Sequence, residues 1–148
     1  MIDFKFSHQE TAEIKQEEKQ VAYLARDNFS PSENKPWFLT IFLQKAPIGV
    51  GSFLEIDPET WEIISITVRE DCHHKKVGSY TLKFMETKIK ELGGRWTIVF
   101  IPLQMKDFFS KNGYHVSNNG EFIEKDGDIY LKMAKFLYPK TYRSRTRH

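Results

Sequence analysis

The chain has 148 residues, of which 40% are hydrophobic and 28% charged, and its formal net charge is +2. These values are typical of one ordinary domain that buries roughly 70% of its unfolded surface. The apolar runs are strand-sized and the first ten residues carry acids, so we expect neither a membrane span nor a signal peptide. A single cysteine, Cys72, excludes an internal disulfide and fits a reducing compartment, so we expect a cytoplasmic protein.

The charge is distributed unevenly along the chain. Both signs are mixed over residues 1–136, whereas residues 137–148 contain basic residues and no acidic ones. We therefore predict a single domain over 1–136 and a basic C-terminal tail over 137–148. The tail is either a solvated end or an arm for an anionic partner. A net charge of +2 does not by itself argue for nucleic acid, which we do not expect as the main partner.

The first elements are predicted from alternation and capping signals. Residues 2–6 alternate and predict a short edge strand. Ser7 and Glu10 have the spacing of a capping box, which predicts a helix over 8–27. After a loop, residues 37–44 and 48–56 predict two strands joined by a turn at 45–47, and residues 61–68 predict a third strand.

The second half alternates strands and helices. The apolar face formed by Leu82, Met85, Ile89 and Leu92 predicts a helix over about 78–92, which Gly93–Gly94 ends by allowing positive φ. A β-branched run at 95–102 predicts a central strand, 105–114 a short helix, and 115–136 two or three short strands. The fold class is therefore α/β (α+β), with a mixed, mostly antiparallel sheet, helices on both faces, and a right-handed parallel crossover over 61–101.

The basic turn at 69–78 joins a predicted buried strand to a helix. Such a turn directs backbone N–H groups and the positive end of the helix at one point. The sequence therefore predicts a phosphate site at the start of the second helix.

This order of elements resembles the GNAT superfamily of N-acetyltransferases over about residues 5–135. The family's loop usually reads arginine or glutamine, two residues, glycine, one residue, and glycine or alanine; here that window runs from His73 to Gly78. The loop departs from the pattern at His73, which replaces the arginine or glutamine, and at Lys76, which replaces the first glycine. The residues of this chain that match the family's later helix are Met105, Phe108, Phe109, Lys111, Gly113 and Tyr114.

The resemblance implies acetyl-CoA as co-substrate. Backbone amides from His73 to Ser79 would hold the pyrophosphate of coenzyme A, and Lys75 and Lys76 would add charge or remain solvated. The strand residues Ile66–Val68 would run beside the pantetheine arm and polarise the thioester carbonyl, because the family splays this strand from the next one. The residues implied in cofactor binding are Ile66, Thr67, Val68, His73, His74, Lys75, Lys76, Val77, Gly78, Ser79, Phe108 and Lys111.

By the same resemblance, Glu62 occupies a position where several family members carry a glutamate general base. The other interpretation is a surface glutamate at the start of a strand. Glu55, Asp57 and Glu59 either form an acidic mouth for a cationic amine or are turn residues.

Phe109 stands where many members have the tyrosine that reprotonates the leaving thiolate. Tyr114 and Tyr80 are the nearest alternatives in the sequence, and water is a third.

No metal is expected. The metal-type residues from Asp71 to His74 are contiguous, and neighbouring side chains of a strand or tight turn point in different directions. We interpret Cys72 as a small apolar residue.

The sequence thus favours an N-acetyltransferase that transfers the acetyl group of acetyl-CoA to an amine of a small molecule or a peptide, by direct attack in a ternary complex. The alternative is a catalytically weakened binding or regulatory module, whose basic tail engages nucleic acid or protein. Many relatives pair through their C-terminal strands or sheet edges, so a homodimer is one expectation from the resemblance. No membrane partner is expected.

Overall fold

The computed structural model describes residues 2–9, 20–25, 28–69, 71–72, 76–117 and 122–137. The predicted basic tail falls outside the described residues beyond 137. The elements, in chain order, are β1 (Ile2–Ser7), β2 (Gln20–Ala25), β3 (Trp37–Leu43), β4 (Ala46–Asp57), β5 (Thr60–Arg69), α1 (Val77–Glu91), β6 (Trp96–Ile101), η2 (Leu103–Met105), α2 (Lys106–Lys111), β7 (His115–Val116), β8 (Phe122–Lys125) and β9 (Asp128–Phe136).

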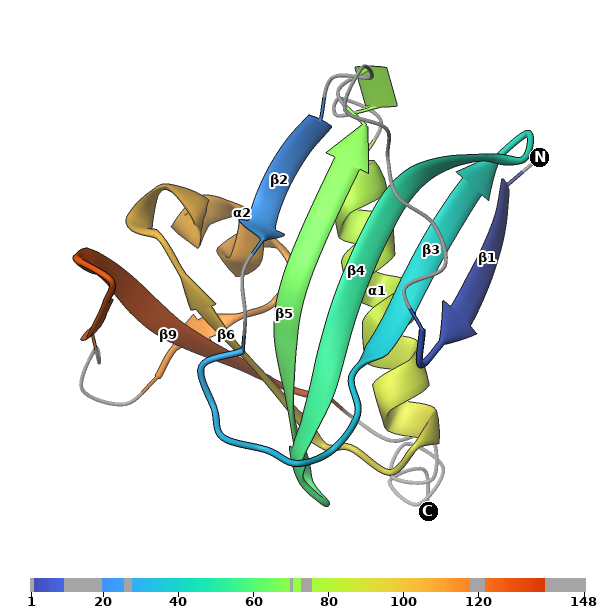
Figure 1. The fold of residues 1–148 in the computed structure, drawn as a ribbon. Coiled ribbons are helices and arrows are strands. Elements are labelled where there is room, and N and C mark those ends of the chain that lie inside the picture. Colours follow the sequence, from blue (N-terminus) through green and yellow to red (C-terminus); the bar gives the residue numbers. More distant parts are fainter. Residues whose placement is uncertain are drawn as a thin grey trace, which may run out of the picture.

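The described strands form one sheet with the order β1-β3-β4-β5-β6-β9-β7, to which β2 adds beside β5 and β8 beside β9 (Figure 1). The pair β5–β6 is parallel and the other pairs are antiparallel. The predicted mixed, mostly antiparallel sheet and the parallel crossover over 61–101 are therefore confirmed. The N-terminal edge strand is also confirmed, with Ile2 and Phe4 exposed on it.

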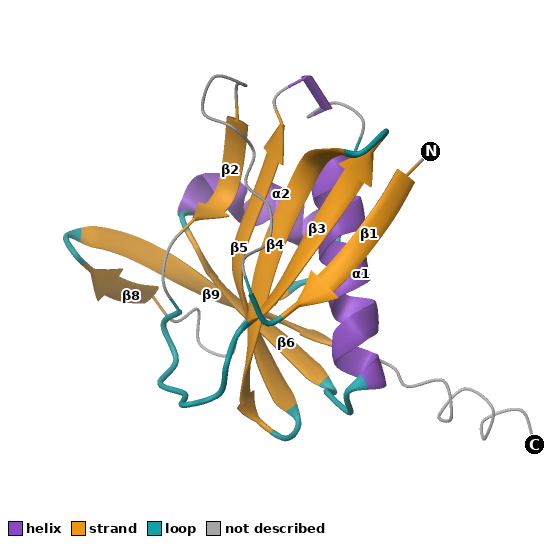
Figure 2. Ribbon diagram, turned by 45° about the vertical axis from the view of Figure 1, so that its right-hand side comes forward, coloured by secondary structure: helices purple, strands orange, loops and turns teal. Residues whose placement is uncertain are grey.

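Both described α-helices lie against the same face of the sheet (Figure 2). The predicted helices on both faces are not found among the described residues, because residues 20–25 of the first predicted helix form a strand. Helix α1 approaches β4 closely because two glycines face it. A Cβ added at Gly49 would lie 2.8 Å from Thr81 Oγ1, and one at Gly51 would lie 2.7 Å from Met85 Sδ. The apolar stripe of α1 completes the core on that face, with Leu82, Met85 and Ile89 fully buried.

Two predictions about the first half of the chain were wrong. Residues 20–25 of the predicted helix 8–27 form strand β2, while residues 10–19 fall outside the described residues. A short apolar run is compatible with the period of a helix and with that of a strand. Here residues 20–25 form a strand because they pair with the edge of β5. The first hairpin turns at Gln44 and Lys45, whose positive φ values of 49° and 70° are those of a two-residue type I′ turn. The predicted turn residues Ala46 and Pro47 belong to β4 instead.

The helix end at Gly93–Gly94 combines two different requirements. Gly93 has the predicted positive φ, 95°, whereas Gly94 is buried where a Cβ would lie 2.6 Å from the Trp61 ring. The first glycine ends the helix by its conformation, and the second lets the chain pass the core.

Candidate active site

Strands β5 and β6 form a fork. They pair in parallel at only three positions, from Thr60 with Trp96 to Glu62 with Ile98. The register of β4 against β5 shifts immediately after this point, because Ser52 pairs with Ser65 and Phe53 with Ile63. The extra residue on β5 is therefore Ile64, a β-bulge, which bends a strand and increases its local twist. The bulge lies where β5 leaves β6, so the predicted splay of this strand is present.

The turn after β5 leads into the N-terminus of α1. Arg69 Nε donates to Asp71 Oδ1 at 2.6 Å, and this hydrogen bond lowers the pKa of the Asp71 carboxyl. Cys72 is buried, in agreement with its interpretation as a small apolar residue. The predicted site residues His73, His74 and Lys75 lie outside the described residues.

Lys76 precedes α1 in the left-handed conformation, with φ 60° and ψ 25°, and its side chain makes no capping hydrogen bond. This is the position at which the family's pattern has its first glycine, and it has the backbone conformation that favours glycine. Val77, Gly78 and Ser79 follow as the first turn of the helix, whose N–H groups have no partner within the helix. The chain thus keeps the backbone of the predicted phosphate turn at Lys76 while losing its glycine.

Glu62 is buried at the vertex of the fork, so it is not a surface glutamate. Its Oε2 accepts the backbone N–H of Phe29 at 2.8 Å, and its Oε1 accepts that of Ser30 at 2.9 Å. The carboxylate thereby fixes the loop at 28–36, which crosses the sheet face opposite α1 (Figure 1). A carboxylate has about four acceptor positions, and the N–H donors of the described residues occupy two of them.

Aromatic rings extend from Glu62 across β6 and β9. The Phe29 ring stacks on Phe100 at 4.7 Å and meets Tyr130 edge-on at 4.9 Å, and Lys125 Nζ lies 4.4 Å from the Phe29 centroid. Phe100, in the predicted central strand at 95–102, is buried.

Next to these rings lies an open pocket of about 640 Å³. Its lining includes Ile98, which pairs with Glu62. The residues that line it are Trp96, Ile98, Gly113, His115, Val116, Ser117, Lys132, Ala134, Lys135 and Phe136.

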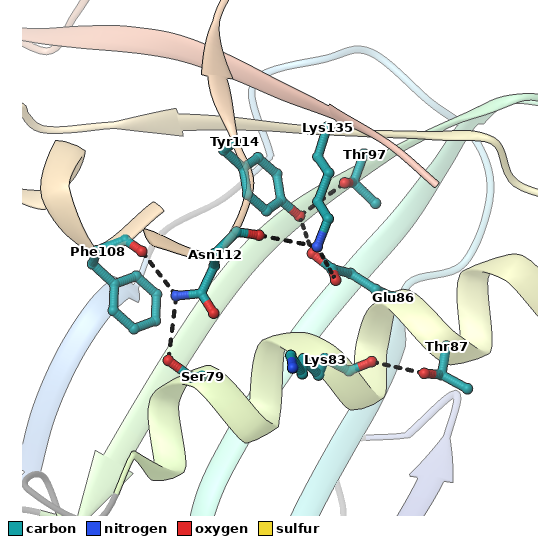
Figure 3. A network of polar contacts seen from close by, with 9 residues as sticks. All are labelled: Ser79, Lys83, Glu86, Thr87, Thr97, Phe108, Asn112, Tyr114 and Lys135. Carbon is teal, nitrogen blue, oxygen red and sulfur yellow. Dashed lines mark hydrogen bonds and ion pairs between the residues drawn. The ribbon is translucent and has the colours of Figure 1, made fainter. Parts of the chain in front are cut away.

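Helix α2 carries the other two predicted cofactor residues. Phe108 is half-buried and Lys111 is exposed in the last turn. Asn112 Nδ2 donates to Phe108 O at 2.8 Å and to Ser79 Oγ at 3.2 Å, which links the end of α2 to the first turn of α1 (Figure 3). The structure therefore brings Phe108 near the phosphate turn.

Tyr114 does not line the fork. Its hydroxyl is buried under α1, donates to Glu86 Oε2 at 2.8 Å and lies 2.8 Å from Thr97 Oγ1 (Figure 3). Burial and the Glu86 charge raise the pKa of Tyr114 well above its usual value of 10.0. Thr97 pairs with Trp61 on the closed side of the fork, so this phenol is not placed to protonate a thiolate in the open part. Phe109 is fully buried and Tyr80 is exposed on α1.

Glu86 joins a network that sequence reasoning missed. Lys135 Nζ lies 2.8 Å from Glu86 Oε1 and 2.9 Å from Asn112 O, so the lysine connects α1, β9 and the end of α2. A signal was present, because Glu86 falls one residue after Met85 and three before Ile89, within the apolar stripe of the helix. A carboxylate inside such a stripe requires a buried partner.

One acidic residue of the β4–β5 turn, Asp57, serves the turn itself. Asp57 Oδ1 accepts the N–H groups of Glu59 and Thr60 at 2.9 Å each. The turn ends at Thr60, which is six residues, or about 20 Å, along β5 from Ile66, where the expected pantetheine segment begins. Of the two interpretations of these acids, the turn role is the one seen for Asp57.

The predicted pantetheine strand is paired along its outer edge. Ile66, Thr67 and Val68 pair with Leu24, Ala22 and Val21 of β2 on the side from which β6 has diverged. Glu62 at the vertex of the fork and the turn before α1 therefore lie near the two ends of β5, and β2 pairs with the part of β5 between them.

The model of the Acetyltransferase (GNAT) family matches residues 3–114. The chain belongs to the GNAT family of acetyltransferases. Among curated proteins, no sequence matches the chain significantly.

Solved structures of the family share the fold. A GNAT family acetyltransferase from Elizabethkingia anophelis with acetyl-CoA bound is 18% identical, covers 92% of this chain and 98% of its own, and has a TM-score of 0.65. The PaiA N-acetyltransferase of Thermoplasma acidophilum in complex with coenzyme A is 24% identical over 68% of this chain and 60% of its own, with a TM-score of 0.57. The aminoglycoside 6′-N-acetyltransferase of Enterococcus faecium is 13% identical over 71% of this chain and 74% of its own, with a TM-score of 0.60.

The described residues contain neither a membrane-spanning helix nor a metal-type cluster. No helix in them has the length and apolarity to span a bilayer. They also contain no group of three or more His, Cys, Asp or Glu residues that could hold a metal ion.

Proposed function

We propose that the chain is an N-acetyltransferase that uses acetyl-CoA to acetylate a primary amine in a ternary complex. The observation that carries the proposal is the fork between β5 and β6, followed directly by the left-handed turn at Lys76 and the N-terminus of α1. In this arrangement an edge of backbone groups leads to a helix start, which suits an amide-bearing arm that ends in a pyrophosphate.

The residues divide the task along the fork. The amides of 73–79, including that of Lys76, would hold the pyrophosphate, with Lys75 adding positive charge nearby. A backbone N–H of Ile66, Thr67 or Val68 would polarise the thioester carbonyl, which stabilises negative charge as it develops on oxygen. Phe108 and Lys111, on α2 beside the phosphate turn, would flank the coenzyme.

Glu62 would act as the base, because it is a buried carboxylate at the vertex of the fork and the described residues supply only two donors to its oxygens. The amine nitrogen attacks the thioester carbon, so that a C–N bond forms as the C–S bond breaks. The proton of the amine passes to Glu62, and coenzyme A leaves as a thiolate. We assign the reprotonation of this thiolate to water, since the Tyr114 hydroxyl donates to Glu86 and the Phe109 side chain has no transferable proton.

The open pocket beside Ile98 is our candidate for the acceptor. Its lining includes the apolar residues Trp96, Ala134 and Phe136, together with Lys132 and His115. These residues favour a partly apolar amine over a polycation. A homodimer that covers this surface would compete with the acceptor.

The test is binding followed by turnover. Isothermal titration should detect acetyl-CoA binding, and release of free coenzyme A should depend on an added amine. We would compare aromatic and aliphatic monoamines with spermidine and an aminoglycoside at equal concentration. Absence of acetyl-CoA binding at millimolar ligand would contradict the proposal.

A second function is favoured by Lys76, which occupies a glycine-type conformation, and by the buried Phe109 at the family's tyrosine position. The chain would then bind acetyl-CoA or a partner without efficient turnover. Tight acetyl-CoA binding combined with no amine-dependent coenzyme A release across the panel would support this regulatory module over the enzyme.

A further inference from the structure

Strand β2 occupies the open part of the fork. It pairs antiparallel with β5 at five positions, from Ala25 with Ser65 to Gln20 with Arg69. Figure 1 shows β2 lying along β5 on the side where β6 diverges. The parallel contact with β6 ends at Glu62, so β6 and β2 share one edge of β5 with only Ile63 and Ile64 between them.

Such pairing uses the backbone groups that an acyl-CoA would need. Alternate residues of a strand direct their N–H and C=O groups to opposite neighbours. On β5, one set pairs with β4 and the other set faces β2. An extended ligand along the fork would compete for this second set, because each N–H of the edge donates to one strong acceptor at a time.

We propose that β2 is an intramolecular strap that must leave the fork before acetyl-CoA can bind. This inference rests on the proposed function, since it assigns the fork to acetyl-CoA. The protein then exists in two states. In the closed state β2 completes the edge of β5, and in the open state that edge is free for the ligand.

The strap is held in a way that permits opening. Among the described residues, β2 has six residues, pairs with β5 alone, and shows a register irregularity between Ala22 and Leu24. Strand β4, in contrast, has twelve residues and a partner on each side. Short elements with one partner open locally at lower free energy than central strands.

Glu62 provides the anchor from which the strap would swing. Its carboxylate holds the N–H groups of Phe29 and Ser30, which follow β2 by only a few residues. The anchor lies at the vertex of the fork, so the strap can leave β5 while the loop at 28–36 stays in place. Opening therefore does not require the rest of the sheet to rearrange.

A reversible crosslink tests the proposal. In a Cys72→Ala background, Ala22→Cys with Thr67→Cys places two cysteines at a paired position of β2 and β5. Asp3→Cys with Phe42→Cys, a paired position of β1 and β3, is the matched control away from the fork. Acetyl-CoA affinity is measured by titration on the oxidised and reduced forms of each pair, so that every variant is its own reference.

We expect oxidation of the strap pair to weaken acetyl-CoA binding at least tenfold, reduction to restore it, and the control pair to show no difference. Equal affinity of the oxidised and reduced strap pair would overturn the proposal. Val21→Pro fixes φ at about −65° and removes a backbone N–H within β2, which disfavours the strand. It should tighten binding roughly fivefold, because the competent state becomes more populated. Unchanged or weaker binding by a folded Val21→Pro variant would also count against the strap.

The two levels fail differently. If wild type, the reduced strap pair and Val21→Pro all fail to bind millimolar acetyl-CoA while remaining folded, the proposed function is wrong and the strap as a gate for acetyl-CoA fails with it. If all three bind and oxidation has no effect, the proposed function stands and the strap alone is wrong.

Discussion

The backbone N–H of Phe29 donates to Glu62 Oε2 at 2.8 Å, across 33 residues of sequence. With the matching bond from Ser30, it gives the candidate base a structural task in addition to a chemical one. A substitution at Glu62 therefore perturbs both the loop and the reaction, and the two effects have to be separated by measurement.

Glu62→Gln should lower both stability and turnover. The amide group of glutamine would place a donor against one of the two N–H groups, which costs about 1–3 kcal/mol of unfolding free energy. Loss of the base should lower kcat by about 10²–10⁴-fold. Phe29→Ala is the control, since it removes the stacking of the same loop on Phe100 and keeps the carboxylate. If kcat falls by less than tenfold, and by the same factor, in Glu62→Gln and Phe29→Ala, Glu62 is only a positioning residue.

Lys76→Gly should stabilise the fold and tighten acetyl-CoA binding. Relief of the left-handed conformation at φ 60° is expected to raise the free energy of unfolding by about 1 kcal/mol. Removal of the side chain should also let a phosphate approach the backbone. Lys45→Gly is a matched control, because Lys45 has φ 70° in the β3–β4 turn on another part of the sheet. Thermal unfolding should shift upward in both variants, whereas affinity for acetyl-CoA should change only for Lys76→Gly; the same affinity change in both would contradict a role for position 76.

The sequence predicts most of the sheet because its strands repeat with period two and its turns carry clear signals. The parallel unit from Trp61 to Ile101 and the helix ending at Gly93 follow from such local patterns. Strand β2 does not, because its conformation depends on an edge of β5 that is distant in sequence. The same limit applies to the site: the position of Glu62 is predictable by register, but its hydrogen bonds to Phe29 and Ser30 arise from a loop that no local pattern specifies.

The boundary of the folded domain gives a further prediction. Leu137 lies just outside the predicted domain 1–136, yet it is buried, and its N–H donates to Arg95 O at 2.7 Å. Leu137→Ala should therefore cost about 2–4 kcal/mol, as other large-to-small substitutions in a core do. A chain that ends after Leu137 should keep the wild-type melting temperature and acetyl-CoA affinity. A marked loss of stability on removing residues 138–148 would show that the domain extends further.

The buried phenol of Tyr114 predicts a loss of stability at alkaline pH. Its pKa is raised in the folded state, first by burial and then by the Glu86 charge, so the folded protein holds the phenolic proton longer than the unfolded chain does. The corresponding stability is fully present below the unfolded pKa of about 10 and is lost as the pH rises from there towards the folded pKa.

Tyr114→Phe removes this titration along with the hydrogen bonds to Glu86 and Thr97. At pH 7 the variant should be less stable by about 1–3 kcal/mol, because a buried carboxylate loses a donor. Between pH 9 and 11 its melting temperature should fall less steeply than that of wild type. Tyr80→Phe, which removes an exposed hydroxyl from α1, controls for the loss of a tyrosine. Parallel melting curves for Tyr114→Phe and wild type over this range would mean that the phenol does not govern alkaline unfolding.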